Sequence, residues 1–399
     1  MGPRRRAPSA HNDTNPPGPV KITIVNGFFL PVPPVAGGAV EKIWFRLAQE
    51  FAAAGHDVTY LSRTWPGFPD REVIDGIRFV RLKGFNHTRR LWINLLLDFW
   101  WGLRVLRRLP PGDIVACNTV ALPVYLSRIK PSAGRVVVVL GRMPKGQSKF
   151  YGGVDRLAAT SEAVRAKVLS EAPRLAARTQ VFPNPIDWEL HQQPPHAGAP
   201  FTIGYVGRMN PEKGIEILLQ AAAELARRPG LPPWRIRLVG PQKIPEGGGG
   251  EAYVAGLRDL AARAGANVTL DPPVYDAVAL AKIYGSFDVF CYPSLAEKGE
   301  GLSVAPLEGM AAGAVPVVSK LDCYNDVIRH RENGLIFDHR AANRVTLLAD
   351  LLAELLTDAA LRRQLADRAR VDARRFDYGA VAAQFLADFE RLQHEPRAR

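Results

Sequence analysis

Short apolar runs alternate with amphipathic segments along most of the chain, a pattern typical of a parallel α/β sheet. In the first half the apolar runs cover residues 21–25, 58–61, 77–82, 113–117, 135–140 and 156–160. Residues 40–54 carry apolar side chains at helical spacing and end at Gly55. Because buried parallel strands are nearly continuous apolar runs joined by helices, this half is expected to form a doubly wound sheet.

The pattern restarts after a proline-rich connection at residues 183–200. Strands are predicted at 201–206, 235–240, 268–270, 289–291 and 315–318, with helices at 214–226 and 378–392. At 399 residues the chain is long enough for two domains, each with its own core. The predicted fold class is therefore α/β, with two Rossmann-like doubly wound domains that face each other across a cleft.

The predicted organisation has four parts. Residues 1–19 are rich in Pro, Arg and Asn and are expected to be a disordered tail. An N-terminal domain is expected at 20–195 and a C-terminal domain at 196–376. Residues 377–399 are expected to form a C-terminal helix that can cross back to the N-terminal domain.

Composition narrows the class of protein. Apolar residues make up 47% and charged residues 23%, as in ordinary globular proteins. The first nineteen residues lack the apolar stretch of a signal peptide, and three scattered cysteines without a CxxC pair argue against disulfides or structural zinc. We expect a cytoplasmic protein, with peripheral attachment at the inner membrane face left open.

The positive charge lies entirely in the N-terminal half. Residues 1–195 contain 27 Lys+Arg and 14 Asp+Glu, whereas residues 196–399 contain 25 of each. This imbalance either serves solubility or faces an anionic partner, such as a membrane surface or a phosphate-bearing acceptor.

Two loops at predicted strand ends carry the candidate chemistry. Arg208 and Lys213 flank the loop after strand 201–206, and such a cation pair suits a diphosphate, although an exposed basic loop is the alternative. After strand 289–291 come a Pro-Ser turn, a glycine loop with Glu300, and a helix that contains Glu308. A helix N-terminus binds phosphate, and neighbouring carboxylates suit sugar hydroxyls. The two loops together predict a nucleotide-sugar site. The domain at 196–376 is therefore expected to bind the nucleotide-sugar, and the domain at 20–195 to be the acceptor side.

These motifs resemble the family 4 retaining glycosyltransferases of the GT-B fold, over residues 20–392. The resemblance is carried by Gly207-Arg208, Lys213-Gly214, Pro293-Ser294, Glu300-Gly301, residues 308–313 and 316–318, with Gly37-Gly38, residues 183–187 and Asn333-Gly334-Leu335 in support. It implies transfer of a sugar, with retention, from a nucleotide-diphosphate sugar to a glycan, a lipid-linked glycan or another acceptor in cell-surface polysaccharide or glycoconjugate synthesis. A UDP-sugar is favoured over a GDP-sugar.

The resemblance also implies roles for individual residues. Arg208 and Lys213 would neutralise the diphosphate, Glu300 would bind sugar hydroxyls and Glu308 the ribose. Backbone N–H groups of Gly301, Leu302 and Ser303 would hold the phosphates and the sugar, and the Gly37-Gly38 loop would close from the opposite domain. The expected catalytic residues are Glu300, Arg208, Lys213 and Asn118.

Asn118 departs from the family pattern, because many members have a histidine there. An amide can bind a sugar hydroxyl but cannot act as a base at neutral pH. Asn118 is therefore either a neutral positioning group or a cap for the next helix. No carboxylate is assignable as a nucleophile, and a front-face mechanism assisted by the leaving phosphate is what the resemblance implies. The chain has no Asp-x-Asp pair, so we expect no metal and no cofactor besides the nucleotide-sugar.

Residues 91–101 form an apolar stretch between groups of arginines and are too short to span a bilayer. The stretch is either a core helix with a basic rim or a helix that contacts the membrane interface. The residues expected on the acceptor or membrane side are Arg89, Arg90, Trp92, Arg142 and Lys145.

Two other functions fit parts of the sequence. A sugar-nucleotide epimerase of similar fold would bind the same donor without an acceptor. A nucleic-acid-binding protein is suggested by the pI of about 9.8, but the excess charge avoids the half with the phosphate motif and no nucleic-acid signature is present.

Overall fold

The computed structural model describes residues 18–398, except residues 87, 89, 195, 197, 199 and 266. The tail predicted at residues 1–19 therefore lies almost entirely outside the described residues, as does Arg89.

The N-terminal domain is built on an eight-stranded sheet with the order β3-β4-β2-β1-β5-β6-β7-β8. All its neighbouring strands are parallel except β3 and β4. Its strands are β1 (Lys21–Val25), β2 (Asp57–Arg63), β3 (Arg71–Ile74), β4 (Ile77–Leu82), β5 (Ile114–Cys117), β6 (Arg135–Leu140), β7 (Arg156–Ala159) and β8 (Thr179–Val181). Its helices are α1 (Ala39–Ala53), α2 (Leu91–Arg108), α3 (Leu122–Ile129) and α4 (Glu162–Glu171).

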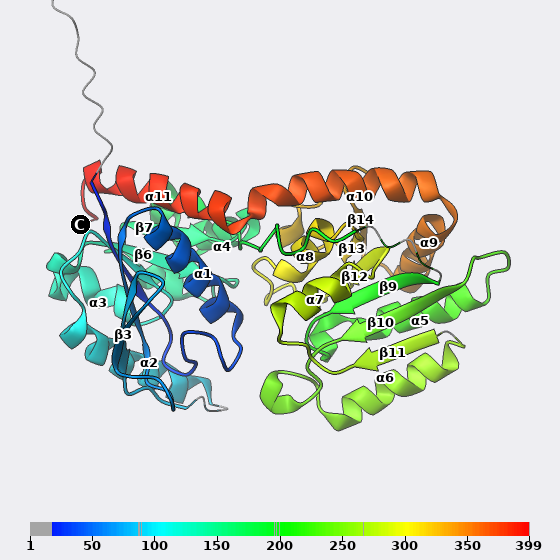
Figure 1. The fold of residues 1–399 in the computed structure, drawn as a ribbon, viewed down its shortest axis with the longest axis horizontal. Helices are drawn as coiled ribbons and strands as arrows, with labels where there is room; N and C mark the ends of the chain where they lie inside the picture. Colours follow the sequence, from blue (N-terminus) through cyan, green and yellow to red (C-terminus); the bar gives the residue numbers. More distant parts are fainter. Residues whose placement is uncertain are drawn as a thin grey trace, which may run out of the picture.

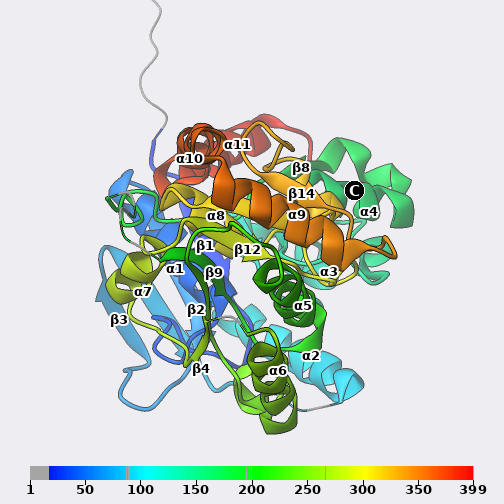
Figure 2. The same ribbon diagram turned by 90° about the vertical axis from the view of Figure 1, so that its right-hand side faces the viewer.

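The C-terminal domain repeats this plan on a six-stranded parallel sheet with the order β11-β10-β9-β12-β13-β14. The strands are β9 (Phe201–Val206), β10 (Trp234–Val239), β11 (Asn267–Asp271), β12 (Val289–Tyr292), β13 (Val315–Ser319) and β14 (Leu335–Phe337). The helices are α5 (Ile215–Ala226), α6 (Glu251–Arg263), α7 (Ala277–Tyr284), α8 (Val304–Ala311), α9 (Arg344–Thr357) and α10 (Ala359–Ala373). Helices α5 and α9 pack together beside this sheet (Figure 2).

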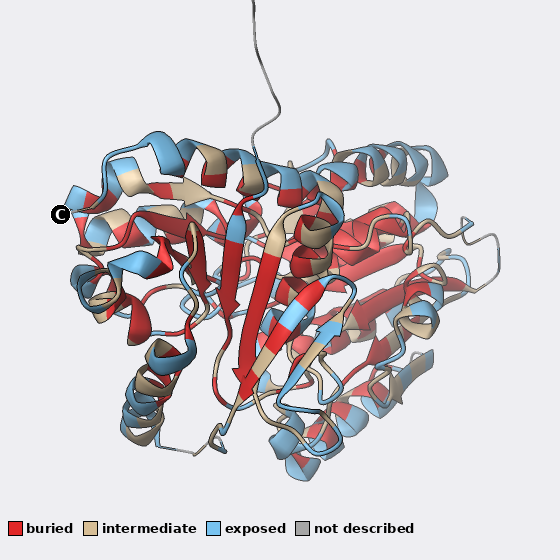
Figure 3. Ribbon diagram, turned by 60° about the vertical axis from the view of Figure 1, so that its left-hand side comes forward, coloured by how far each residue is buried: buried red, intermediate tan, exposed pale blue. Residues whose placement is uncertain are grey.

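The predicted fold class is confirmed, because two doubly wound α/β domains lie side by side (Figure 1). Most strand residues in both sheets are buried (Figure 3). The N-terminal sheet has a hydrophobic cluster on each face, and the C-terminal domain has one large cluster of its own. Strands β3, β8 and β14 were not predicted; they are short, at three or four residues each.

The last helix, α11 (Tyr378–His394), follows α10 along one side of the molecule and lies against the N-terminal domain (Figure 1). Phe385 and Phe389 pack against α1, and Asp388 forms a fully buried ion pair of 2.8 Å with Arg156 on β7. The two segments that cross between the domains are joined by hydrogen bonds of 2.8 Å from Ile186 N to Phe376 O and 3.1 Å from Tyr378 N to Ile186 O. The domains are thus connected by two adjacent crossings.

Candidate active site

A cleft of about 600 Å³ lies between the domains, at the carboxyl ends of strands from both sheets. The N-terminal domain contributes the start of α1 and the loops after β5 and β6. The C-terminal domain contributes the loops after β9 and β12 and the start of α8. Among the predicted site residues, Arg208, Lys213, Glu300, Leu302, Ser303, Asn118 and Arg142 line this cleft.

Lys213 and Glu300 form a buried ion pair on the floor of the cleft. The Lys213 ammonium bonds the Glu300 carboxylate and lies 5.3 Å from the centre of the Tyr292 ring. The carboxylate also accepts hydrogen bonds from the hydroxyls of Ser294 at 3.2 Å and Ser303 at 2.5 Å. Both oxygens of Glu300 are therefore held in place, and the positive charge of Lys213 is balanced locally.

The surroundings stabilise the charged forms of both partners. Burial acts to raise the pKa of Glu300, but Lys213 and the two serine hydroxyls outweigh it, so the pKa lies below its usual value. Burial likewise acts to lower the pKa of Lys213, and Tyr292 and Glu300 hold that pKa above its usual value. The pair stays ionised throughout the neutral range.

Arg208 supplies a more accessible positive charge. Its guanidinium bonds Glu212 at 2.8 Å, and the side chains of this pair are 41% and 47% exposed. Gly214 makes the tight turn behind it, because its φ is +63° and a Cβ atom there would lie 2.1 Å from Pro293 O. This turn brings the loop after β9 against the loop after β12, so Arg208 and the start of α8 line the same cleft.

The loop before α8 is held by side chains of the N-terminal half. Ser161 Oγ donates to Gly301 O at 2.7 Å, and Asn184 Nδ2 donates to Leu302 O at 2.6 Å. A Cβ atom on Gly301 would lie 2.6 Å from Gly141 O, so only glycine fits this contact. With the carbonyl oxygens of the loop engaged, helix α8 begins at Val304 without a side-chain cap.

Glu308 lies in a neighbouring cavity of about 180 Å³ rather than in the main cleft. It is buried in α8, and its carboxylate accepts a 2.8 Å hydrogen bond from the Tyr284 hydroxyl. Lys42, Arg46 and Leu280 line the same cavity. The two glutamates therefore face separate parts of the interdomain region.

Gly37 and Gly38 lead into α1, with φ angles of +80° and +100°. The cleft wall opposite α8 is formed by the residues that follow them, Ala39 and Val40. The glycines thus turn the chain so that the start of α1 faces the cleft.

Asn118 follows β5 and lines the cleft, where its Nδ2 donates to Asn26 Oδ1 at 3.0 Å. The interpretation of Asn118 as a helix cap is wrong. Helix α3 begins after Ala121, and the N–H groups of Val120 and Ala121 donate to the Asp98 carboxylate of α2 at 3.1 and 2.7 Å. Asn118 is left facing the cleft as a neutral polar group.

The four described residues expected on the acceptor or membrane side come from two separate segments. Arg142 is exposed at the edge of the cleft and Lys145 is exposed further along the same loop. Arg90 and Trp92 lie at the start of α2. Within the described residues, no three His, Cys, Asp or Glu side chains are grouped to hold a metal ion.

Sequence reasoning missed the groups that support this site. Tyr292, Ser294, Ser161 and Asn184 hold the glutamate or its loop. The Pro-Ser turn after strand 289–291 and the proline-rich connection at residues 183–200 are visible in the sequence, but their contacts with the loop at 300–302 are formed only in the folded chain. From the sequence alone, Asp98 only interrupts the apolar stretch at residues 91–101.

The architecture and the site define a two-domain GT-B protein. Residues 36–190 match the model of the family described as Glycosyltransferase Family 4, and residues 186–372 match that of Glycosyl transferases group 1. The two matches together cover most of the chain, which belongs to the family 4 glycosyltransferases of the GT-B fold.

Relatives at the sequence level include phosphatidyl-myo-inositol mannosyltransferase of Mycobacterium tuberculosis, which is 30% identical over 191 residues. That match covers 47% of this chain and 47% of the relative, so the chain spans about half the length of the curated relatives it matches first. Spore coat protein SA of Bacillus subtilis is 24% identical over 401 residues, covering 93% of this chain and all of that protein.

Among solved structures, sucrose-phosphate synthase from Thermosynechococcus elongatus matches with a TM-score of 0.77 and 20% identity, over 94% of this chain and 99% of that one. HepE from Anabaena, in complex with UDP and glucose, matches with a TM-score of 0.70 and 18% identity, over 93% of this chain and all of that one. These similarities establish the fold.

Proposed function

We propose that this chain transfers a sugar from a nucleotide-diphosphate sugar to a hydroxyl of a glycan or lipid-linked acceptor, in cell-surface polysaccharide or glycoconjugate synthesis. The observation that carries the proposal is the convergence of Arg208, Lys213, Glu300 and the start of α8 on one interdomain cleft. Cations and free backbone N–H groups suit the diphosphate, and a fixed carboxylate suits sugar hydroxyls. The complexes of HepE with UDP favour a UDP-sugar as donor.

The proposed reaction breaks the bond between the sugar C1 and the diphosphate oxygen and forms a bond from the acceptor oxygen to C1 on the same face. The acceptor proton passes to the leaving diphosphate. Both oxygens of Glu300 are already engaged by Lys213, Ser294 and Ser303, which suits a hydrogen-bond acceptor better than a nucleophile. Retention without a covalent enzyme intermediate fits this arrangement. Catalysis then rests on positioning and on stabilising the departing charge.

We also propose that the reaction needs no metal, because Arg208 and the α8 N-terminus place positive potential where the diphosphate would lie. The mycobacterial relatives are named for a phosphatidyl-myo-inositol substrate, which supports an acceptor that carries phosphate or lipid.

The test is release of free nucleotide by the purified chain from a panel of UDP- and GDP-sugars, with and without a chelator. Arg208→Ala should lower kcat/KM by about a hundredfold, because it removes a group that stabilises the leaving charge. Arg363→Ala, an exposed arginine on α10, is the matched control and should leave kcat/KM unchanged. Full activity of Arg208→Ala would overturn the assignment, and loss of activity with the chelator would overturn metal independence.

A further inference from the structure

Helix α2 presents a continuous apolar face to solvent. The face consists of Leu91, Trp92, Leu95, Leu96, Phe99 and Trp100, which are between 42% and 70% exposed. These residues recur at the spacing of one side of a helix, so they form a single stripe. A stripe of this size on an otherwise ordinary surface marks an interaction site.

The opposite face of α2 is fixed to the domain, so the helix cannot rotate to bury this stripe. Trp101 is fully buried, and its indole Nε1 donates to Asn26 O at 2.9 Å. Asp98 is also buried and accepts hydrogen bonds from Val120 and Ala121. The apolar face is therefore held at the surface by the contacts of the folded domain.

The surroundings of the stripe are strongly basic. Residues 83–112 contain six Lys or Arg and one acidic residue, the buried Asp98. Arg90, Arg107 and Arg108 are exposed at the two ends of α2, and within the described part of the chain no carboxylate pairs with them. An apolar stripe with tryptophans and a rim of arginines complements an anionic lipid surface better than it complements a protein.

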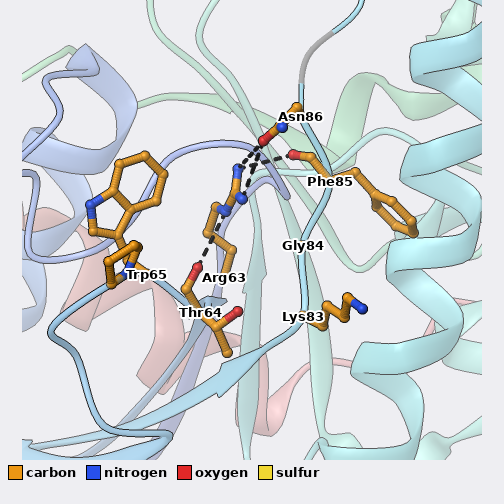
Figure 4. Close-up of a pocket in the computed structure, with 8 residues that line it drawn as sticks. Arg63, Thr64, Trp65, Lys83, Gly84, Phe85 and Asn86 are labelled. Atoms are coloured by element: carbon orange, nitrogen blue, oxygen red, sulfur yellow. Dashed lines mark hydrogen bonds between the residues drawn. The ribbon is translucent and has the colours of Figure 1, made fainter.

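A basic pocket adjoins α2 at the carboxyl ends of β2 and β4. It encloses about 360 Å³ and is lined by Arg63, Trp65, Lys83 and Asn86, among others (Figure 4). Arg63 donates to Phe29 O at 2.8 Å and to Phe85 O at 3.0 Å, contacts that hold the guanidinium without neutralising its charge. The pocket therefore has the charge and size to take a phosphate group.

Arg104 connects this pocket to α2. Its guanidinium lies 4.3 Å from the centre of the Phe85 ring and donates to Lys83 O, so α2 forms part of the pocket's support. Arg104 follows Trp100 by about one helical turn, so the pocket adjoins the C-terminal end of the apolar stripe.

We propose that the apolar face of α2 and the Arg63 pocket together dock the N-terminal domain on an anionic phospholipid bilayer. The stripe enters the boundary between headgroups and acyl chains, and the pocket takes a lipid phosphate. Among the described residues no helix is long and apolar enough to cross a bilayer. Asp98 links α2 to Val120 and Ala121 beside the cleft, so, if the proposed function holds, a lipid-linked acceptor enters from this side.

The test is cosedimentation of the purified chain with vesicles of phosphatidylcholine alone and with added phosphatidylglycerol. Binding is expected only with the anionic lipid and should weaken as salt is raised. Leu96→Glu should weaken it by about tenfold or more, because a carboxylate is placed at the acyl boundary. Lys83→Gln should weaken it by about fivefold. Val371→Glu is the matched control, since Val371 is 67% exposed on α10, and should bind as the unaltered chain does.

Three results would overturn the proposal. Unchanged vesicle binding by Leu96→Glu would show that the apolar face of α2 does not contact the bilayer. A dimer in light scattering that Leu96→Glu converts to monomer would assign the face to a second copy of the chain. Unchanged vesicle binding by Lys83→Gln would exclude the Arg63 pocket from the docking surface. Nucleotide release without vesicles tests the donor site separately, and Leu96→Glu is expected to leave it unchanged.

Discussion

The buried pair of Lys213 and Glu300 gives the sharpest test of how the floor of the cleft is built. Their side chains are only 6% and 11% exposed, so neither charge is well solvated when its partner is lost. Two charges about 4 Å apart at an effective dielectric constant of about 20 attract by about 4 kcal/mol. Removing one partner of a buried pair costs about 3–5 kcal/mol, because the other charge stays buried and unpaired.

We therefore expect Glu300→Gln to lower the free energy of unfolding of the C-terminal domain by about 3–5 kcal/mol, and Lys213→Met to do much the same. In the double variant the free energy of unfolding should fall by far less than the sum of the two single effects, because no buried charge remains. The coupling energy should be about 2 kcal/mol or more. Urea denaturation followed by tryptophan fluorescence measures all four proteins.

The exposed pair of Arg208 and Glu212 is the matched control. Its atoms are 2.8 Å apart, but the side chains are nearly half exposed, so its coupling should be about 0.3–0.5 kcal/mol and should fall with salt. If Lys213 and Glu300 coupled no more strongly than this surface pair, the interpretation of the cleft floor as a buried ion pair would be refuted.

Three further outcomes follow from the geometry. Because the pKa of Glu300 is lowered in the folded chain, the charged carboxylate stabilises the fold fully above about pH 4.5, and this stabilisation is lost as the pH falls below that value. In thermal melts from pH 7 to 3, the Tm of the unaltered chain should therefore fall more steeply than the Tm of Glu300→Gln. Gly301→Val should lower kcat/KM for the donor about tenfold or more by displacing the loop from Gly141, as steady-state nucleotide release would show. Asp98→Ala should cost about 1–3 kcal/mol in chemical denaturation, because two N–H groups lose their acceptor.

The part of the cleft formed by the C-terminal domain could largely be predicted, because its sequence signals are local. Apolar runs, glycines in turns and a charged residue just past a strand end fix where Arg208, Lys213 and Glu300 lie. The carboxyl edge of a parallel sheet then brings the loops after β9 and β12 together.

The remaining features depend on contacts between distant segments. Ser161 reaches Gly301 and Asn184 reaches Leu302 across more than a hundred residues, which no short pattern encodes. The spacing of Glu300 and Glu308 does not say that they face different cavities, because both cavities are lined in part by α1 of the other domain. Asp98 looks like a flaw in an apolar helix until the N–H groups it binds are seen.

The placement of α11 has a consequence for synthesis of the chain. Helix α11 supplies Phe385, Phe389 and the buried partner of Arg156 to the N-terminal domain, so the core of this domain stays incomplete until residues 378–394 have been translated. The C-terminal domain takes its core from residues 186–376 and can be completed first. Although synthesis runs from the N-terminus, the core of the N-terminal domain is therefore completed after that of the C-terminal domain. Arg135 and Arg156 gain partners that are translated more than two hundred residues later.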